Sequence, residues 1–323
     1  MKIVCVSTST IPADTANSIQ VMKACQGLAR AGHTVHLLVP GKRSADWETL
    51  SELYGLMASF DISWLPARPR LKRNDFAWAA VHRARKLGVE LLYTWTGQSA
   101  VFGLLSGLPV AFEVHDLPTG KLGPLWFHAI LRLRGKKRLL PITRALLGKL
   151  EQAYGPIPAA QVVISPNGVD LEQYTALPDA AAARRALGLP GQVTVMCVGH
   201  LYAGRGVDLF IGLAQRFPQA GFVWVGGRAE DVQAYRARVA ADGMANVTFT
   251  GFIPQRRLPC YQAAADVLLM PYAQKIAGSS GGNSADICSP MKMFDYLTAG
   301  RAILSSDLPV VHEVLNETNA VFA

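Results

Sequence analysis

The sequence predicts an α/β protein made of two doubly wound parallel sheets that follow one another along the chain. Two observations carry this prediction. Strand-length apolar runs alternate with helix-length amphipathic segments from the first residues, and the alternation starts again after a stretch rich in proline and alanine. The chain has 323 residues, and one hydrophobic core usually serves about 150 residues. We therefore expect two Rossmann-like domains.

The first domain is expected to cover residues 1–175. A helix is predicted at Ser18–Ala31, between the first two strands. The predicted strands of this domain are Lys2–Ser7, Thr34–Val39, Ile62–Leu65, Glu90–Thr94, Val110–Val114, Leu139–Thr143 and Gln161–Ser165. Residues 176–190 contain Pro178, Pro190 and an alanine-rich turn, and we expect them to form the linker.

The second domain is expected to cover residues 191–323 and to repeat the pattern. Its predicted strands are Gln192–Val198, Gly221–Val225, Asn246–Thr250, Asp266–Met270 and Ala302–Ser305. Its predicted helices are Val207–Arg216, Asp231–Ala241, Arg257–Ala264 and Met291–Thr298. Open α/β sheets bind ligands beyond the carboxyl ends of their strands, so two such domains predict a ligand cleft between them. A long Gly/Ser-rich loop at 272–289 is a further functional candidate.

Composition and charge narrow the class of protein. Half of the residues are apolar and 17% are charged, which excludes a disordered chain. No apolar run has the roughly 18–20 residues of a membrane-spanning helix, and the apolar start Ile3–Val6 is too short for a signal peptide, so we expect a cytoplasmic protein. The net charge of +9 is concentrated in residues 67–86 and 132–144 and predicts anionic partners: nucleotides, lipid headgroups or nucleic acid.

The five cysteines lie far apart, mostly within apolar segments, and are Cys5, Cys25, Cys197, Cys260 and Cys288. Their spacing matches no metal site, so we expect them to be reduced and structural. The sequence contains no D-x-D motif, which disfavours catalysis by a divalent metal. It also has no G-x-G-x-x-G after the first strand and no G-x-x-x-x-G-K-[ST], so neither a nicotinamide oxidoreductase nor a P-loop NTPase fits.

A phosphate-binding motif follows the first strand of the second domain. Gly204, Arg205 and Gly206 open a predicted helix, where glycines let the backbone approach a phosphate and the helix N-terminus offers free N–H groups. An ordinary turn with a solvated arginine has the same local sequence. A second helix N-terminus begins at Met291 and carries Asp295, which is either a ribose ligand or a carboxylate favoured by the helix dipole.

In the first domain, polar residues follow the predicted strand Val110–Val114. His115 and Asp116 should emerge at the carboxyl edge of the sheet, where a histidine can donate to sugar hydroxyls or phosphate oxygens and a carboxylate can orient it. A structural histidine is the alternative. Glu113, within the strand, is either a buried paired acid or a second carboxylate in the cleft.

Taken together, these features resemble the retaining GT-B glycosyltransferases of family 4 over nearly the whole chain. The phrases that carry the resemblance are Thr15–Ser18, Glu113–Asp116, Ser165–Asp170, Val198–Val207, Phe249–Pro254 and Ser289–Gly300. The resemblance implies the GT-B fold, with the two Rossmann-like domains facing a cleft. It implies metal-independent, retaining transfer of a hexose-type sugar from a UDP- or GDP-sugar to a glycan, lipid-linked or small-molecule acceptor, with no cofactor.

The same resemblance assigns residues to roles. It places the donor diphosphate on Arg205, His200, Gly204, Met291 and Lys292, the ribose on Asp295, the base on Phe252 and Ile253, the donor sugar on Asp286 and Ser289, the reacting centre on His115 and Asp116, and the acceptor loop on Asn17 and Ser18. The sequence departs from the family pattern in three ways. His200 stands where a second arginine is common, and Ile287, next to Asp286, stands where the family has an acid. The loop before the first helix lacks the common Gly-Gly pair and has Ser9, Thr10, Ala16 and Asn17 instead. Asp295 stands where the family usually has the glutamate that binds the ribose.

The acceptor is expected on the basic first domain. Residues 122–137 mix large apolar side chains with four basic residues, and Trp78 lies close to Arg70, Lys72 and Arg73 in the sequence. This composition suits peripheral docking on the anionic inner face of the cell membrane, or else a core-facing helix with a solvated basic face. Family members normally continue beyond the position of Ala323, so we expect a C-terminal truncation.

Two other functions remain open on the sequence. The first is another GT-B enzyme, such as a UDP-sugar 2-epimerase or a sugar phosphorylase. The second is a non-catalytic basic module that binds nucleotides or nucleic acid, although nucleic acid is the less favoured partner. Steep salt dependence of oligonucleotide binding would distinguish such a module from a transferase.

Overall fold

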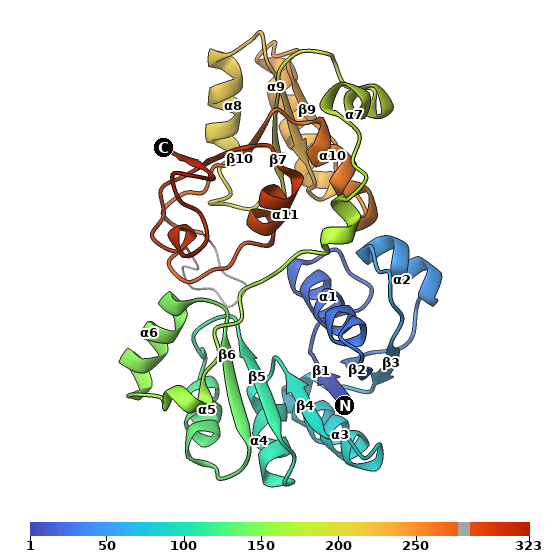
Figure 1. The fold of residues 1–323 in the computed structure, drawn as a ribbon, viewed down its shortest axis with the longest axis vertical. Coiled ribbons are helices and arrows are strands. Elements are labelled where there is room, and N and C mark those ends of the chain that lie inside the picture. The colour runs from blue at the N-terminus through green and yellow to red at the C-terminus, as the bar shows by residue number, and fades with distance from the viewer. Residues whose placement is uncertain (277–284) are drawn as a thin grey trace. The chain divides into compact units, whose positions relative to one another are not determined.

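The computed structural model describes residues 1–276 and 285–323 and divides into two compact units (Figure 1). Unit 1 is Met1–Pro166 and unit 2 is Asn167–Ala323. The division comes earlier than residue 176, where the sequence predicts the linker. Most of that stretch forms helix α7 (Ala180–Leu187), which belongs to unit 2.

The alanine-rich stretch is a helix because its ends carry strong helix signals. The Asp179 side chain accepts a hydrogen bond from the Ala182 amide at 2.7 Å, and Gly188 ends the helix in the left-handed conformation. Alanine has the highest helix propensity of any residue. Pro178 and Pro190 lie outside the helix, so they flank its ends and remove none of its internal hydrogen bonds.

Unit 1 contains a six-stranded parallel sheet with the order β3-β2-β1-β4-β5-β6. The strands are β1 (Lys2–Val6), β2 (Thr34–Pro40), β3 (Asp61–Leu65), β4 (Leu91–Thr94), β5 (Val110–Val114) and β6 (Lys137–Pro141). The helices are α1 (Ala16–Arg30), α2 (Trp47–Tyr54), α3 (Asn74–Lys86), α4 (Gly97–Leu105), α5 (Gly123–Arg132) and α6 (Arg144–Tyr154). The strand order reverses between β1 and β4, as a doubly wound sheet requires.

The predicted strand Gln161–Ser165 is the one element of unit 1 that the structure does not form. The segment lies along β6, but only an isolated bridge joins Val162 to Leu139. The amides of Val163 and Ser165 donate to β6 carbonyls at 3.0 and 2.9 Å. The chain then meets Pro166, which has no N–H to extend a ladder. The segment is therefore extended but too sparsely bonded to count as a strand.

Unit 2 repeats the architecture with the strand order β12-β11-β10-β7-β8-β9, again all parallel (Figure 1). The strands are β7 (Thr194–Val198), β8 (Gly221–Val225), β9 (Val247–Phe249), β10 (Val267–Met270), β11 (Ala302–Ser305) and β12 (Val321–Phe322). The helices after α7 are α8 (Val207–Arg216), α9 (Ala229–Ala241), α10 (Leu258–Ala264) and α11 (Met291–Ala299). The reversal falls between β7 and β10. The two doubly wound sheets predicted from the sequence are thus confirmed.

The central strands are buried on both faces. All five residues of β5 and all five of β8 are buried. Parallel strands covered by helices on both sides have this continuous apolar character. In unit 2, the Phe210 ring on α8 makes edge contacts with Phe222 and Trp224 at 5.4 and 5.2 Å, which ties the helix to the sheet. Each sheet therefore forms a rigid base for the loops at its carboxyl edge.

Tyr54 is one of the side chains that hold the long loop between β1 and α1. The Tyr54 hydroxyl, at the end of α2, accepts from the Ala13 amide at 2.8 Å and donates to the Ala13 carbonyl at 2.9 Å. Tyr54 is fully buried, and its burial raises the pKa of the hydroxyl to about 12. Because the pKa is raised on folding, this contribution to stability is complete below about pH 10 and is lost as the pH rises through about 12.

We expect Tyr54→Phe to lower the free energy of unfolding of unit 1 by about 1–3 kcal/mol, because two buried backbone groups lose their partner. Faster hydrogen exchange at the Ala13 amide and a lower urea midpoint would report the change. The matched control is Tyr154→Phe, which removes a hydroxyl from a half-buried ring packed on Phe127 and should change stability by less than about 0.5 kcal/mol. Unchanged exchange at Ala13 would contradict the prediction.

Candidate functional site

The loop after β7 and the loop after β10 meet backbone to backbone at the strand-order reversal of unit 2. Gly206 has a φ of +82°, and a Cβ built on it would lie 1.6 Å from the Pro271 carbonyl oxygen. Gly204 has a φ of +80°, and its Cβ would lie 2.2 Å from the Lys275 oxygen. The Ala273 amide donates to the Gly204 carbonyl at 3.0 Å. Only glycine fits at these two positions, so the glycines of the motif hold the Arg205 loop against β10.

Two positive side chains lie over one buried aromatic ring at this place. The Arg205 guanidinium carbon is 5.6 Å from the centre of the Tyr272 ring, and Lys292 Nζ is 4.9 Å from the same centre. Lys292 Nζ also lies 3.6 Å from the Cys197 sulfur, and Tyr272 is only 4% exposed. The ring attracts each cation. The two cations repel one another, so the arrangement favours an anion that contacts both.

The thiols beside these cations remain protonated at neutral pH. Burial raises the pKa of Cys197, against the lowering effect of the Lys292 charge. Burial likewise raises the pKa of Cys288 to about 11, against the Arg205 charge. The expectation that the cysteines are reduced and structural agrees with five free thiols, three of them buried.

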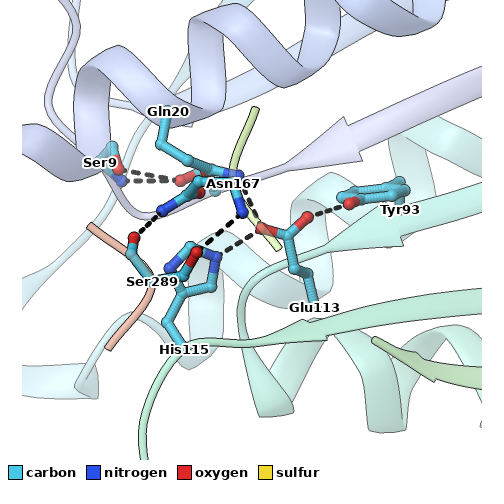
Figure 2. A network of polar contacts seen from close by, with 8 residues as sticks. Ser9, Gln20, Tyr93, Glu113, His115, Asn167 and Ser289 are labelled. Atoms are coloured by element: carbon cyan, nitrogen blue, oxygen red, sulfur yellow. Dashed lines mark hydrogen bonds and ion pairs between the residues drawn. The ribbon is translucent and has the colours of Figure 1, made fainter. Parts of the chain in front are cut away.

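The start of α11 is held by the turn that follows the unit boundary. The Asn167 amide donates to Ser289 Oγ at 3.1 Å, and the Asn167 side chain donates to the Ser289 carbonyl (Figure 2). Ser289 is 6% exposed, whereas Asp286 is exposed. The proposed sugar-binding pair therefore splits into a buried serine that fixes the helix start and an exposed carboxylate. Residues 277–284 of the predicted functional loop lie outside the described residues.

Asp295, on α11, faces Tyr174, which is half-buried. Burial raises the pKa of Tyr174, and the charge of Asp295 and a hydrogen bond with it raise that pKa further. Met291 is the first residue of α11 and is half-buried. The helix thus presents Lys292 and Asp295 from two successive turns.

The residues expected at the base lie beyond β9, on the edge of the same sheet. Phe252 is 37% exposed and Ile253 is half-buried. His200, after β7, stacks on the Tyr202 ring with a centroid distance of 4.9 Å and an interplanar angle of 14°. The Arg228 guanidinium lies 5.5 Å from the centre of the same ring. The structure therefore brings His200 together with Tyr202 and Arg228, two residues to which the sequence analysis gives no role.

A buried glutamate organises the carboxyl edge of unit 1. Glu113, on β5, is 4% exposed and accepts hydrogen bonds from Gln20 at 2.6 Å, from the Tyr93 hydroxyl, and from His115 Nε2 at 2.5 Å (Figure 2). Burial, followed by the Glu113 charge, raises the pKa of Tyr93, so this hydroxyl stays a donor. Of the two interpretations open for Glu113, the structure shows the buried paired acid.

This glutamate sets the tautomer of His115. An ionised carboxylate can only accept, so the hydrogen bond places the proton of a neutral His115 on Nε2 and leaves Nδ1 as an acceptor. His115 itself is 29% exposed. Asp116 does not orient the ring as expected, because its carboxylate accepts from the next backbone amide, of Leu117, at 2.8 Å. Glu113 has the orienting role that the sequence reading gave to Asp116.

The two residues of the expected acceptor loop differ in exposure. Ser18 is 1% exposed, and its hydroxyl donates to the Thr10 carbonyl at 2.9 Å. Its amide is bonded by the Thr15 side chain, which caps α1. Asn17 is exposed on the first turn of the helix. Ser18 therefore shapes the loop, and Asn17 is the one of the pair that faces solvent.

Within residues 1–276 and 285–323, no three His, Cys, Asp or Glu side chains gather as metal ligands would. None of the helices in the described ranges combines the length and the apolar character needed to cross a bilayer.

The two doubly wound parallel sheets define a two-domain Rossmann-like α/β protein. The sheet of unit 2 carries the cations Arg205 and Lys292 near the start of a helix that follows Gly206, and the sheet of unit 1 carries the oriented His115. Residues 18–173 match the model of the family described as glycosyltransferase family 4, and residues 192–323 match that of the glycosyl transferases group 1. Together these two glycosyltransferase matches span most of the chain, and the fold is that of the GT-B glycosyltransferases.

Curated glycosyltransferases match parts of the chain. A GDP-mannose-dependent alpha-(1-6)-phosphatidylinositol monomannoside mannosyltransferase of Mycolicibacterium smegmatis is 34% identical over 146 residues, 42% of this chain and 37% of that protein. A 2-deoxystreptamine N-acetyl-D-glucosaminyltransferase of Streptomyces fradiae is 32% identical over 151 residues, 44% of this chain and 32% of that protein. The matches span about a third of the length of these relatives.

Solved structures match the fold over the whole chain. Anabaena HepE in complex with UDP has a TM-score of 0.72 at 18% identity, covering 100% of this chain and 85% of that one. Sucrose-phosphate synthase from Thermosynechococcus elongatus has a TM-score of 0.73 at 20% identity, covering 99% and 85%. Both matches support the GT-B arrangement of two six-stranded sheets.

We expect Gly206→Ala to destabilise unit 2 by about 3 kcal/mol or more, because the new methyl group overlaps a backbone carbonyl and φ is positive. Hydrogen exchange in β8, measured across a urea series, reports unit 2 alone. The control is Gly212→Ala in the same helix, where the added Cβ meets nothing within 4 Å and should raise stability by up to about 1 kcal/mol. Equal effects of the two substitutions would show that the close approach is not a constraint.

Proposed function

We propose that this protein transfers a hexose-type sugar from a UDP- or GDP-sugar to a glycan, lipid-linked or small-molecule acceptor, without a metal and with retention of the anomeric configuration. The matches to the two glycosyltransferase family models support sugar transfer from a nucleotide sugar. The single observation that carries the proposal is the pair of cations, Arg205 and Lys292, over Tyr272 at the strand-order reversal of unit 2.

The donor diphosphate is proposed to bind these two cations. It carries the negative charge that relieves their repulsion, and an arginine can contact phosphate oxygens with two parallel hydrogen bonds. The helices α8 and α11 begin beside the two side chains, at Val207 and Met291, and add positive dipole ends and free amides. Gly204, His200 and Met291 complete the diphosphate site in this proposal, Asp295 binds the ribose, and Phe252 and Ile253 flank the base.

The reaction breaks the bond between the anomeric carbon and the oxygen of the β-phosphate, and it forms a bond from that carbon to an acceptor hydroxyl. The nucleoside diphosphate leaves with the electron pair of the broken bond, and one of its phosphate oxygens takes up the proton that the acceptor hydroxyl loses. Charge develops on the leaving diphosphate, where Arg205 and Lys292 stabilise it. Fixed cations supply here the stabilisation for which other transferases use a metal.

His115 is proposed to hydrogen-bond the reacting sugar. The bond to Glu113 fixes its ring orientation and leaves the other nitrogen as an acceptor for a sugar hydroxyl proton. Asp116 is proposed to contact the same sugar, and Asp286 and Ser289 are assigned to other hydroxyl groups of the donor. Asn17 and Ser18 are assigned to the acceptor, with Ser18 acting through the shape of its loop.

We expect Arg205→Ala and Lys292→Ala each to weaken binding of a UDP- or GDP-sugar by about 10- to 100-fold, the value of one charge-assisted hydrogen bond. Calorimetry of a nucleotide-sugar panel in EDTA measures this affinity. Arg216→Ala, which removes an exposed charge from the far end of α8, is the matched control and should leave the affinity unchanged.

The outcome separates the competing functions. Binding that is lost in both variants and needs no metal supports the donor site. A protein that binds no nucleotide but binds oligonucleotides with steep salt dependence would instead be the basic binding module. Release of a free sugar epimer in place of a glycosylated acceptor would favour an epimerase.

The acceptor is proposed to reach unit 1 at an anionic membrane surface. Trp78 on α3 is 63% exposed and stacks on His82 at 5.5 Å, and Leu71 is 46% exposed. Exposed basic residues lie near them in the sequence, and we call the whole set the α3 surface: Arg68, Arg70, Leu71, Lys72, Arg73, Trp78, His82, Arg83, Arg85 and Lys86. An exposed indole among several cations suits anionic lipid headgroups.

The second expected membrane segment, residues 122–137, is less exposed than its composition indicates. Phe127 and Ile130 on α5 are buried in the core, although Leu125 is 63% exposed. Lys137 is buried, and its Nζ donates to the carbonyls of residues 130, 131 and 133 at 2.7–2.8 Å, which closes the end of α5. For most of this segment the structure shows a core-facing helix.

We expect Trp78→Ala to reduce binding to vesicles of phosphatidylglycerol and phosphatidylcholine by about fivefold, since burying part of an indole contributes about 1 kcal/mol. Co-sedimentation at several salt concentrations measures the effect, which should add to a salt-dependent term from the basic residues. Leu105→Ala, which trims another side chain of unit 1 that is 65% exposed, is the control. Equal losses in both variants, or no binding to anionic vesicles, would contradict docking by the α3 surface.

A further inference from the structure

Three elements of unit 2 meet at the hydroxyl of one half-buried tyrosine. Tyr174 ends the 3-10 helix η3 (Leu171–Tyr174), close after the unit boundary. Its hydroxyl lies 2.7 Å from Oε1 of Gln262 on α10, and it shares a hydrogen bond with Asp295 on α11. Burial keeps the pKa of Tyr174 well above its usual value, so the hydroxyl carries its proton at any physiological pH.

The single proton of Tyr174 has two candidate acceptors, the Gln262 amide oxygen and the Asp295 carboxylate. Gln262 is 0% exposed, and among the described residues its side-chain nitrogen has no hydrogen-bond partner. Turning the amide by half a turn places this nitrogen against the Tyr174 oxygen and gives the buried donor an acceptor. The tyrosine proton is then left for Asp295. A carboxylate is the stronger acceptor, because hydrogen bonds to ionised groups are about twice as strong as neutral ones.

We propose that Tyr174 is a positioning residue for Asp295, with the hydrogen bonds running from Gln262 to Tyr174 and from Tyr174 to the carboxylate. The carboxylate then accepts the tyrosine proton in a hydrogen bond, and this bond fixes the direction from which Asp295 accepts a ribose hydroxyl. The proposal rests on the proposed function, since it takes Asp295 as the residue that binds the ribose of the nucleotide.

The proposed network predicts a specificity for the sugar of the nucleotide. A carboxylate with one fixed oxygen accepts from a hydroxyl in one direction only, so a nucleotide that lacks this hydroxyl leaves a desolvated oxygen unpaired. Without the tyrosine, the short aspartate side chain can rotate and be solvated by water. Loss of Tyr174 should therefore reduce discrimination between ribose and deoxyribose more than it reduces binding to the diphosphate.

The test compares wild type, Tyr174→Phe, Asp295→Asn and the double variant. Calorimetry gives the affinities for UDP and GDP and for the 2′-deoxy form of each. We expect the preference of the wild type for ribose to fall by about fivefold or more in Tyr174→Phe, the loss of one hydrogen bond. In the Asp295→Asn background the tyrosine substitution should change the preference no further, because its effect passes through the carboxylate.

Further variants separate positioning from a general loss of structure. Gln262→Met preserves the volume and removes the amide, and should lower the same preference by a smaller factor. Tyr235→Phe, which alters a ring stacked on Phe249 near the outer strand β9, should leave it unchanged. Circular dichroism and thermal melting check that each variant is folded.

The possible results are distinguishable. If the wild type binds no nucleotide, both the proposed function and this inference are wrong. If the wild type prefers ribose and Asp295→Asn loses that preference, but Tyr174→Phe retains it, the donor site stands and the positioning role is overturned. If Tyr174→Phe lowers the preference equally in both backgrounds, the tyrosine acts without Asp295 and the inference is again wrong.

Discussion

The close approach of two backbone segments at the strand-order reversal of unit 2 is the constraint on which the proposed donor site depends. The carbonyls of Pro271 and Lys275 occupy the space where side chains on Gly206 and Gly204 would lie. This close packing fixes the position of Arg205 after β7. Its guanidinium lies over the ring of Tyr272, which follows β10. Lys292 then reaches the same ring from α11. Three separate chain segments thus converge on one aromatic ring.

In unit 1, the buried side chain of Glu113 holds the residues at the carboxyl edge of the sheet in place. Glu113 collects three hydrogen bonds, from a helix, from the neighbouring strand and from its own loop. An ionised carboxylate in the interior is costly unless such donors compensate it. The three donors therefore stabilise the Glu113 carboxylate, and the carboxylate in turn fixes the positions of Gln20, Tyr93 and His115. The orientation of His115 follows from the core of the sheet and does not depend on a flexible loop.

The periodicity of the sequence is sufficient to predict both sheets, because buried parallel strands and amphipathic helices leave strong patterns. The linker predicted at 176–190 is misplaced, because Pro178 and Pro190 lie just outside the two ends of the helix α7 and do not mark a linker. The edge residues His115 and Arg205 are predictable from their positions after strands. Gln20 and Tyr174 are not, because their partners lie 93 and 88 residues away in the sequence and no local motif marks them. Tyr272 lies two residues after the end of β10. The expectation that ligands bind beyond the carboxyl ends of parallel strands would therefore have identified it.

The contiguity of the two units has a consequence for biosynthesis. Every strand of the first sheet is encoded before Pro166, and every strand of the second comes after it. The ribosome therefore releases a complete set of pairing partners for the first sheet before the second begins to emerge. Domains with this layout fold in order during translation, and their apolar strand edges are covered early. A chain of this kind keeps its aggregation-prone intermediates short-lived without interleaving the two halves.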